Sequence, residues 1–230
     1  MDIKNTLKKL QDKTYKQFTS TLVPNINPEN IIGVRAPNLK NLAKQMIKQN
    51  QFDFLQNLPH EFLEENNLHS YIISQIDNFD ECIKNTNNFL PYIDNWATCD
   101  CLRPKCFKDN TKQLLEYIKI WLKSSHSYTI RFAIEMLMLH FLDDNFDPQF
   151  CEIIANINSQ EYYVNMMISW YFATALAKQY PTAIKYLQNK KLPQFVHNKT
   201  IQKATESFLI PNKTKQYLKS LKIKQIAIFL

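Results

Sequence analysis

The sequence has a single glycine, Gly33, among 230 residues. Glycine-rich phosphate loops need several glycines, because their backbone adopts positive φ angles and comes very close to the phosphate. P-loop and Rossmann-type nucleotide sites are therefore excluded. Two-residue hairpin turns also depend on glycine, so an all-β sandwich or barrel is not expected. The composition favours helices.

Long apolar runs and paired metal-ligand motifs are also missing. No stretch of about 18 residues is apolar and free of charge, and the N-terminal residues MDIKNTLKKLQDK lack the apolar core of a signal peptide, so we expect a cytoplasmic protein without a membrane span. An odd number of cysteines indicates reduced thiols (Cys82, Cys99, Cys101, Cys106, Cys151). Their spacing lacks the two-pair pattern of structural zinc, and no metal is expected.

Arginine is scarce as well, with three among 28 basic residues: Arg35, Arg103 and Arg131. The net charge of +7 is unevenly distributed. Residues 1–48 carry 9 basic and 3 acidic side chains, residues 49–177 carry 8 and 17, and residues 178–230 carry 11 and 1. Two basic ends around an acidic middle are typical of a protein that binds a polyanion, although a lysine-rich solvated surface would give the same count.

What the sequence does contain is helical periodicity along nearly the whole chain. One helix is expected after Pro37, with its N-cap at Ala36 or a neighbour. The other predicted helices span about 3–18, 60–76, 79–92, 112–123, 127–142, 147–157, 161–178, 182–188 and 199–208. Short loops separate them, so the sequence predicts an all-α fold, an α-solenoid of stacked helical pairs with a concave basic face.

The segment Tyr162–Ala177 is apolar on nearly every face and is expected to be an inner helix of this stack. No linker rich in proline or serine interrupts the chain. We therefore predict one domain over residues 1–230, with about the last ten residues as a loosely attached tail.

Three segments carry side chains that could do chemistry. Trp96 and Asp100 are four residues apart, which puts both on one face of a helix. Arg131 and Trp170 each lie in an otherwise apolar helical pattern. Structural roles are open for all four, because tryptophan is commonly core, a helical aspartate is commonly solvated, and a lone arginine commonly forms an ion pair.

These segments, Asn95–Asp100, Tyr128–Ala133 and Glu161–Trp170, occur together with Gly33–Leu39 and Asn198–Ser207. In this order they resemble the DNA alkylation repair family of AlkC/AlkD-type DNA glycosylases over about residues 15–220. The resemblance implies a solenoid of HEAT-like helical pairs that hydrolyses the N-glycosidic bond of N3- and N7-alkylated purines in duplex DNA without base flipping. It is closer to a side branch with an NWAxCD motif, since Asn95 stands where the AlkD branch has tryptophan.

The resemblance also implies roles for individual residues. Asp100 corresponds to the catalytic carboxylate, and Trp96 and Trp170 correspond to aromatic residues that contact the lesion. Arg131 corresponds to an arginine on the DNA backbone, and Arg35, Lys199 and Lys203 in the resembling segments are expected to bind DNA. We expect a monomer that needs no cofactor.

Chemical reasoning supports a carboxylate at such a site. An alkylated purine is a cationic leaving group, and its departure leaves an oxocarbenium-like sugar that an anion stabilises. Two alternatives stay open at this point. One is a DNA-binding homologue with weak or no catalysis, which recognises damaged or unusual DNA structures, and the other is a protein-binding α-solenoid.

Overall fold

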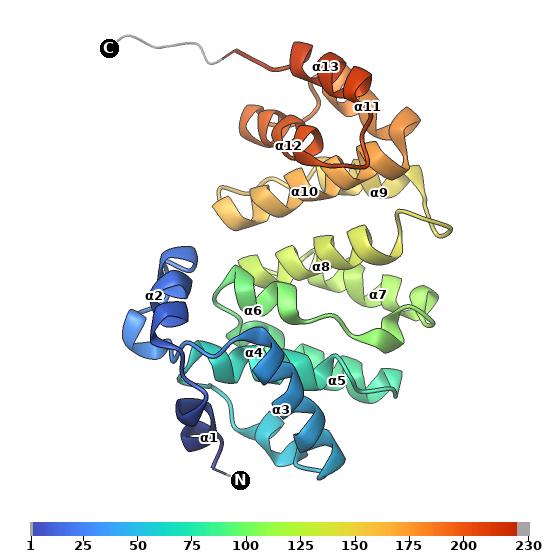
Figure 1. The fold of residues 1–230 in the computed structure, drawn as a ribbon. Coiled ribbons are helices and arrows are strands. Elements are labelled where there is room, and N and C mark those ends of the chain that lie inside the picture. Colours follow the sequence, from blue (N-terminus) through green and yellow to red (C-terminus); the bar gives the residue numbers. More distant parts are fainter. Residues whose placement is uncertain (1, 225–230) are drawn as a thin grey trace. The chain divides into compact units, whose positions relative to one another are not determined.

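A computed structural model describes residues 2–224 of the chain. Within these residues the protein is all-α, with thirteen α-helices, four short 3-10 helices and no strand. The chain divides into two compact units, Met1–Leu114 and Leu115–Leu230, and the helix α7 (Thr111–Trp121) contains the boundary. Figure 1 shows the helices in chain order.

The N-terminal unit has six α-helices before α7 in the described residues, and their bounds follow. They are α1 (Ile3–Lys9), α2 (Lys13–Leu22), α3 (Ala36–Lys48), α4 (Leu63–Ile73), α5 (Phe79–Phe89) and α6 (Trp96–Cys101). The 3-10 helices are η1 (Pro28–Asn30), η2 (Phe52–Gln56), η3 (Leu90–Tyr92) and η4 (Lys105–Phe107). Helix α4 is central to this unit because it packs against α1, α3, α5 and α6.

The C-terminal unit continues the pattern of neighbouring helices. It contains α8 (Ser127–His140), α9 (Pro148–Ala155), α10 (Tyr162–Lys178), α11 (Tyr180–Gln188), α12 (Gln194–Glu206) and α13 (Asn212–Ser220). Helix α10 packs against α8, α9, α11 and α12, and Figure 1 shows it beside α12. The prediction that Tyr162–Ala177 forms an inner helix is confirmed.

In each unit the helices pack side by side, α3 on α4 and α4 on α6 in the first unit and α8 on α10 and α10 on α12 in the second, in the manner of an α-solenoid, which confirms the predicted fold class. The concave basic face and the single domain stay predictions. The predicted tail falls mostly on residues 225–230, which lie outside the described residues. Before them, Ile223 is held by Asn198, whose side chain accepts from Ile223 N at 3.0 Å and donates to Ile223 O at 2.9 Å.

Helix boundaries differ from the prediction where side chains cap the backbone. The single helix expected over 3–18 is wrong: α1 ends at Lys9, and Asp12 caps the start of α2, its carboxylate accepting from Tyr15 N at 2.9 Å. The last predicted helix, 199–208, begins earlier, at Gln194. Helix α13 was not predicted, since its mostly polar sequence carries few apolar residues.

The lone glycine and a buried glutamate fix the segment that precedes α3. Gly33 has φ +94°, and a Cβ there would lie 2.6 Å from Asp12 O, so another residue would clash. Glu64 of α4 is 2% exposed, and its carboxylate accepts from the backbone N–H groups of Ile32, Gly33 and Val34 at 2.8, 2.6 and 3.2 Å. This carboxylate therefore ties the start of α3 to α4.

Candidate nucleic-acid interface

Helix α6 begins at a buried asparagine. Asn95 is its N-cap, and the side-chain oxygen accepts from Thr98 N at 2.8 Å while the amide nitrogen donates to Thr98 Oγ1 at 3.0 Å. Asparagine is among the best N-cap residues, whereas tryptophan has no acceptor for this purpose. The departure at position 95 from the AlkD pattern thus has a structural reason here, because it fixes the start of the helix that carries Trp96 and Asp100.

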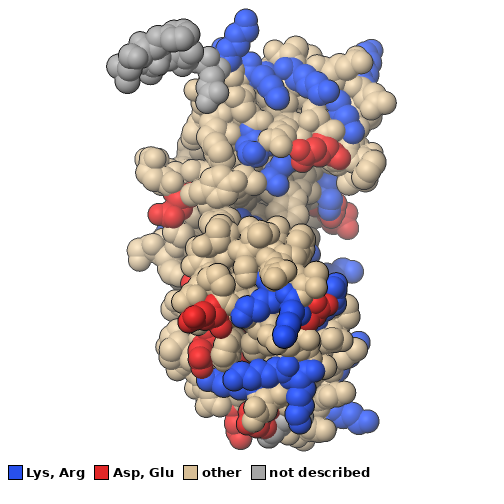
Figure 2. Space-filling model, turned by 60° about the vertical axis from the view of Figure 1, so that its left-hand side comes forward, with Lys and Arg blue, Asp and Glu red and all other residues tan. Residues whose placement is uncertain are grey.

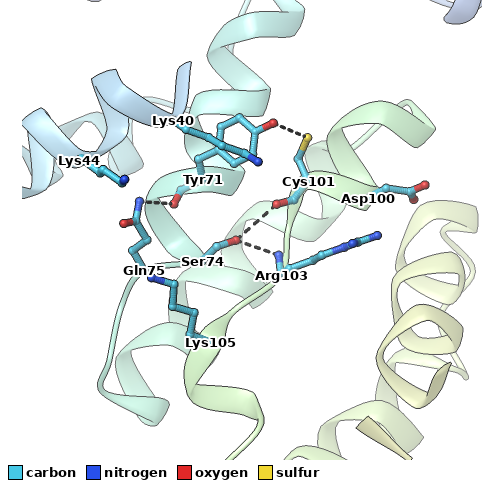
Figure 3. Close-up of a pocket in the computed structure, with 9 residues that line it drawn as sticks. All are labelled: Lys40, Lys44, Tyr71, Ser74, Gln75, Asp100, Cys101, Arg103 and Lys105. Atoms are coloured by element: carbon cyan, nitrogen blue, oxygen red, sulfur yellow. Dashed lines mark hydrogen bonds between the residues drawn. The ribbon is translucent and has the colours of Figure 1, made fainter. Parts of the chain in front are cut away.

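A pocket of about 380 Å³ lies in the N-terminal unit beside the end of α6. Figure 3 shows its lining side chains, which come from three stretches of the unit. These are Lys40 and Lys44 of α3, then Tyr71, Ser74 and Gln75 at the end of α4, then Asp100, Cys101, Arg103 and Lys105. Asp100 is the predicted catalytic residue, and it is half-buried on the wall of this pocket.

Hydrogen bonds hold the walls of the pocket together. Ser74 Oγ accepts from Arg103 N at 2.8 Å and donates to Ser70 O at 2.6 Å. Cys101 Sγ donates to Tyr71 Oη at 3.1 Å. The bonds from Arg103 to Ser74 and from Cys101 to Tyr71 join the end of α4 to the segment around the end of α6. The backbone that carries Asp100 and Arg103 is therefore fixed against α4.

The pocket combines cationic groups with one carboxylate. The ammonium group of Lys40 lies 5.4 Å from the centre of the Tyr71 ring, a cation–π distance. Burial raises the pKa of the Tyr71 hydroxyl, and it also raises the pKa of the Cys101 thiol, so both groups stay protonated at neutral pH. Asp100 is therefore the anionic side chain of a lining that otherwise carries positive charge.

Trp96 has different neighbours from Asp100 although it begins the same helix. Its indole packs against a buried cluster of Val23, Ile31 and Leu63, and Nε1 donates to Leu22 O at 2.9 Å. The side chain is half-buried. Trp96 therefore fixes α6 against the end of α2 in addition to any contact with a ligand.

In the C-terminal unit the structure brings two predicted site residues together. Lys203 of α12 places its ammonium group 5.6 Å from the ring of Trp170 of α10. Both border a pocket of about 430 Å³, which is also lined by Ala173, Thr174, Ala177, Glu206, Ser207 and Leu209. Trp170 is half-buried. The indole and a cation thus share one opening of this unit.

Lys199 lies one turn before Lys203 on α12. Its ammonium group donates to Gln202 Oε1 at 2.9 Å and lies 6.0 Å from the Phe195 ring. It lines a third pocket, of about 440 Å³, together with Gln194, Phe195, Asn198, Gln202 and Lys222. Lysines of α12 therefore border two neighbouring openings in the C-terminal unit.

The two arginines of the predicted set have partners within the protein. Arg131 is 5% exposed, and its Nη1 donates to Tyr163 O at 2.7 Å, which links α8 to α10. Arg35 is exposed and forms an ion pair with Asp12 at 2.8 Å, its guanidinium lying 4.9 Å from the centre of the Tyr15 ring. Their predicted contacts with DNA stay predictions.

Sequence reasoning singled out Asp100 but not the other lining residues of its pocket. The signal for two of them was available: Lys40 and Lys44 are four residues apart, on the side of α3 opposite its buried residues. Tyr71 is followed three and four residues later by Ser74 and Gln75, the helical spacing of one face, at the end of α4. The sequence does not indicate that these faces of α3 and α4 lie beside the segment 100–105.

Figure 2 shows lysine and arginine side chains on the surface of each unit, with acidic side chains between them. No lysine in the described part of the chain is buried. The lysines of the N-terminal unit and those of the C-terminal unit are therefore accessible to a ligand.

The family model for DNA alkylation repair enzymes matches residues 3–208 of the chain. The chain therefore belongs to the DNA alkylation repair enzyme family, which assigns it to the repair of alkylated DNA and confirms the family resemblance seen in the sequence. A search of curated proteins gave no match. In the described residues, no helix is both long and apolar enough to span a membrane.

Proposed function

We propose that the protein is a DNA glycosylase that hydrolyses the N-glycosidic bond of N3- and N7-alkylated purines in duplex DNA. The observation that supports this most directly is the position of Asp100, a half-buried carboxylate on the wall of a pocket rich in lysine and arginine. Positive charge attracts the DNA backbone, and the carboxylate lies in the same pocket lining as these cations.

The carboxylate acts on the sugar. Alkylation at N3 or N7 makes the purine cationic, so the base is already a good leaving group. As the glycosidic bond breaks, positive charge develops on the deoxyribose, and Asp100 stabilises that charge and orients the attacking water. This chemistry needs no metal or organic cofactor, and a base that stays stacked needs no binding pocket of its own.

The remaining predicted residues bind and position DNA in this proposal. Trp96 and Trp170 offer aromatic faces to a cationic sugar, an interaction of about 1–2 kcal/mol when water is excluded. The cation–π contact between Lys203 and Trp170 supports this use of Trp170, because the ring already accepts a cation. Arg35, Lys199 and Lys203 lie at least partly at the surface, where they neutralise phosphates.

Base release from a defined lesion tests the proposal. A duplex with 7-methylguanine or 3-methyladenine is incubated with the protein, and free base and abasic sites are measured against a reaction without protein. We expect release well above the spontaneous rate. Release equal to the spontaneous rate for both lesions would refute the glycosylase assignment.

A second candidate function is a DNA-binding homologue with little or no catalysis, which recognises damaged or unusual DNA structures. The burial of Arg131 favours it, because a guanidinium bonded to Tyr163 O contributes to packing between α8 and α10. Lesion binding without base release in the same experiment would support this alternative.

A further inference from the structure

Three lysines, Lys40, Lys44 and Lys105, line the Asp100 pocket together. Lys4, Lys119, Lys178 and Lys191 each pair with a carboxylate. In the described residues, by contrast, no ion pair involves Lys40, Lys44 or Lys105. Three ammonium groups around one opening repel each other, so the arrangement favours an anion between them.

The charged side chains of the pocket lie at different places along its length. In Figure 3, Lys44 and Lys105 lie at one end of the pocket, Asp100 and the guanidinium of Arg103 lie at the other, and Lys40 lies beside the Tyr71 ring between them. We call Lys40, Lys44 and Lys105 the lysine end. The carboxylate of the lining lies away from this lysine end, so a ligand that fits the lysine end carries an anionic group.

We propose that the lysine end binds a backbone phosphate next to the nucleotide whose sugar faces Asp100. This inference rests on the proposed function, in which Asp100 acts on the sugar of the damaged nucleotide. It adds a phosphate site that orients the damaged strand. A phosphate is directly bonded to the deoxyribose in the DNA strand, so one sugar–phosphate unit reaches both the lysine end and Asp100. Its volume of about 380 Å³ leaves room for a sugar–phosphate unit.

Tyr71 gives this site a neutral donor. Its hydroxyl oxygen accepts from Cys101, which leaves the hydroxyl proton available to an incoming oxygen. Because burial raises the pKa of Tyr71, that proton is retained at physiological pH. An anion at the lysine end can therefore accept from Tyr71 as well as from the ammonium groups.

The salt dependence of binding to undamaged duplex DNA tests the phosphate site without requiring catalysis. The variant Lys40→Gln/Lys44→Gln removes two charges from exposed positions of α3 and keeps residues that favour helix. Lys9→Gln/Lys84→Gln, two exposed lysines of the same unit outside the pocket, is the matched control. We expect the slope of log K against log salt to fall by about 2 in the pocket variant, and by clearly less in the control. Equal slopes in the two variants would overturn the proposal.

The position of the phosphate is tested with a duplex that contains a tetrahydrofuran abasic analogue. A neutral methylphosphonate replaces either flanking phosphate of the analogue. The wild type should lose affinity for one of the two duplexes, and the pocket variant should show no such loss. An equal loss in both proteins would place the lysines on other phosphates and overturn the assignment.

Two further outcomes separate this proposal from its alternatives. Binding of a polyglutamate peptide with the same dependence on Lys40 and Lys44 would indicate an acidic protein partner and overturn the phosphate site. If the wild type releases no base but the slope and methylphosphonate results hold, the glycosylase assignment fails and the phosphate site remains.

Discussion

The two units use their candidate tryptophans differently. In the N-terminal unit Trp96 packs on an apolar cluster and donates its indole N–H to Leu22 O at the end of α2. In the C-terminal unit Trp170 borders an open pocket, and a lysine ammonium lies 5.6 Å from its ring. The same residue type therefore contributes to the fold in one unit and lines an opening in the other.

The units also differ in what lies beside each tryptophan. Asp100 follows Trp96 by one helical turn and faces a pocket with lysines and an arginine. Near Trp170 the charged lining residues are Lys203 and Glu206. A chemical role is thus best supported in the N-terminal unit, whereas the C-terminal unit offers an aromatic and cationic surface for binding.

The largest effect is expected at Asp100. Asp100→Asn keeps nearly the same shape and removes the charge that stabilises the developing sugar cation, so base release should fall by two to three powers of ten, about 3–4 kcal/mol. Folding and duplex binding should persist, since losing a negative charge cannot weaken attraction to phosphates. Single-turnover release of 7-methylguanine measures the effect after subtraction of the spontaneous rate.

Release by the wild type with no loss in Asp100→Asn would mean that the catalytic carboxylate is elsewhere. In that case the comparison between the two units would no longer favour the N-terminal one. Circular dichroism of the variant is the control for its fold.

The two tryptophans should also differ in how much each contributes to the free energy of unfolding. Trp96→Ala removes packing on the Val23 cluster and a hydrogen bond, so unfolding should become easier by about 3 kcal/mol. Trp170→Ala should cost about 1–2 kcal/mol, because part of its indole faces the pocket. Denaturant unfolding of both variants measures the difference, and Trp96→Phe should recover most of the packing.

A larger loss of stability for Trp170→Ala than for Trp96→Ala would reverse this ranking. It would show that the apolar surroundings of α10, and not the open pocket, determine the contribution of Trp170.

Much of the fold could be predicted from local pattern. The apolar Tyr162–Ala177 segment had to be an inner helix, because it has no face suited to water. The four-residue spacing of Trp96 and Asp100 suits one face of a helix, but the short helix α6 and its Asn95 cap were not among the predicted elements. Capping was harder to foresee: Asp12 divides a continuous helical pattern because its carboxylate satisfies the first backbone N–H groups of α2.

The site was predicted less completely, because it depends on contacts between distant segments. Lys40, Tyr71 and Arg103 line one pocket, yet nothing in their local sequence indicates that they meet. Arg131 illustrates a second limit. Its sequence surroundings suit a buried arginine that bonds a carbonyl as well as one that contacts phosphate, and only packing places its guanidinium on Tyr163 O.

Acid should destabilise the N-terminal unit through a pair of histidines, the buried His69 and the half-buried His60. His60 Nε2 lies 2.8 Å from His69 Nδ1, and the rings stack on Phe54 and Phe89. Burial lowers the pKa of His60 to about 4 and that of His69 to about 3, below the ordinary value of 6.5. The unfolded chain therefore takes up these protons first, so this stability is complete above pH 6.5 and is lost as pH falls toward 4 and 3.

Unfolding free energy measured from pH 7 to pH 4 should fall by about 1.4 kcal/mol per pH unit for each histidine that is protonated only on unfolding. His60→Gln/His69→Gln should have a shallower pH dependence than the wild type. His140→Gln, at a single histidine of the C-terminal unit whose pKa burial also lowers, should change the dependence less. If the wild type and both variants have the same pH dependence, protonation of His60, His69 and His140 does not affect the free energy of unfolding.

The smallest effect is expected at Lys203, and it bears most directly on the C-terminal unit. Lys203→Met keeps an unbranched side chain against Trp170 and removes the ammonium group. Stability should change by only about 0.5–1 kcal/mol, the range of a cation–π contact near the surface. If the ammonium also neutralises a phosphate, the salt slope of duplex binding should fall by about 1. Lys213→Met, at an exposed lysine of α13, is the control. A salt slope that matches the wild type would restrict Lys203 to its contact with the ring, and the C-terminal unit would then need Lys199 or other lysines for any hold on DNA.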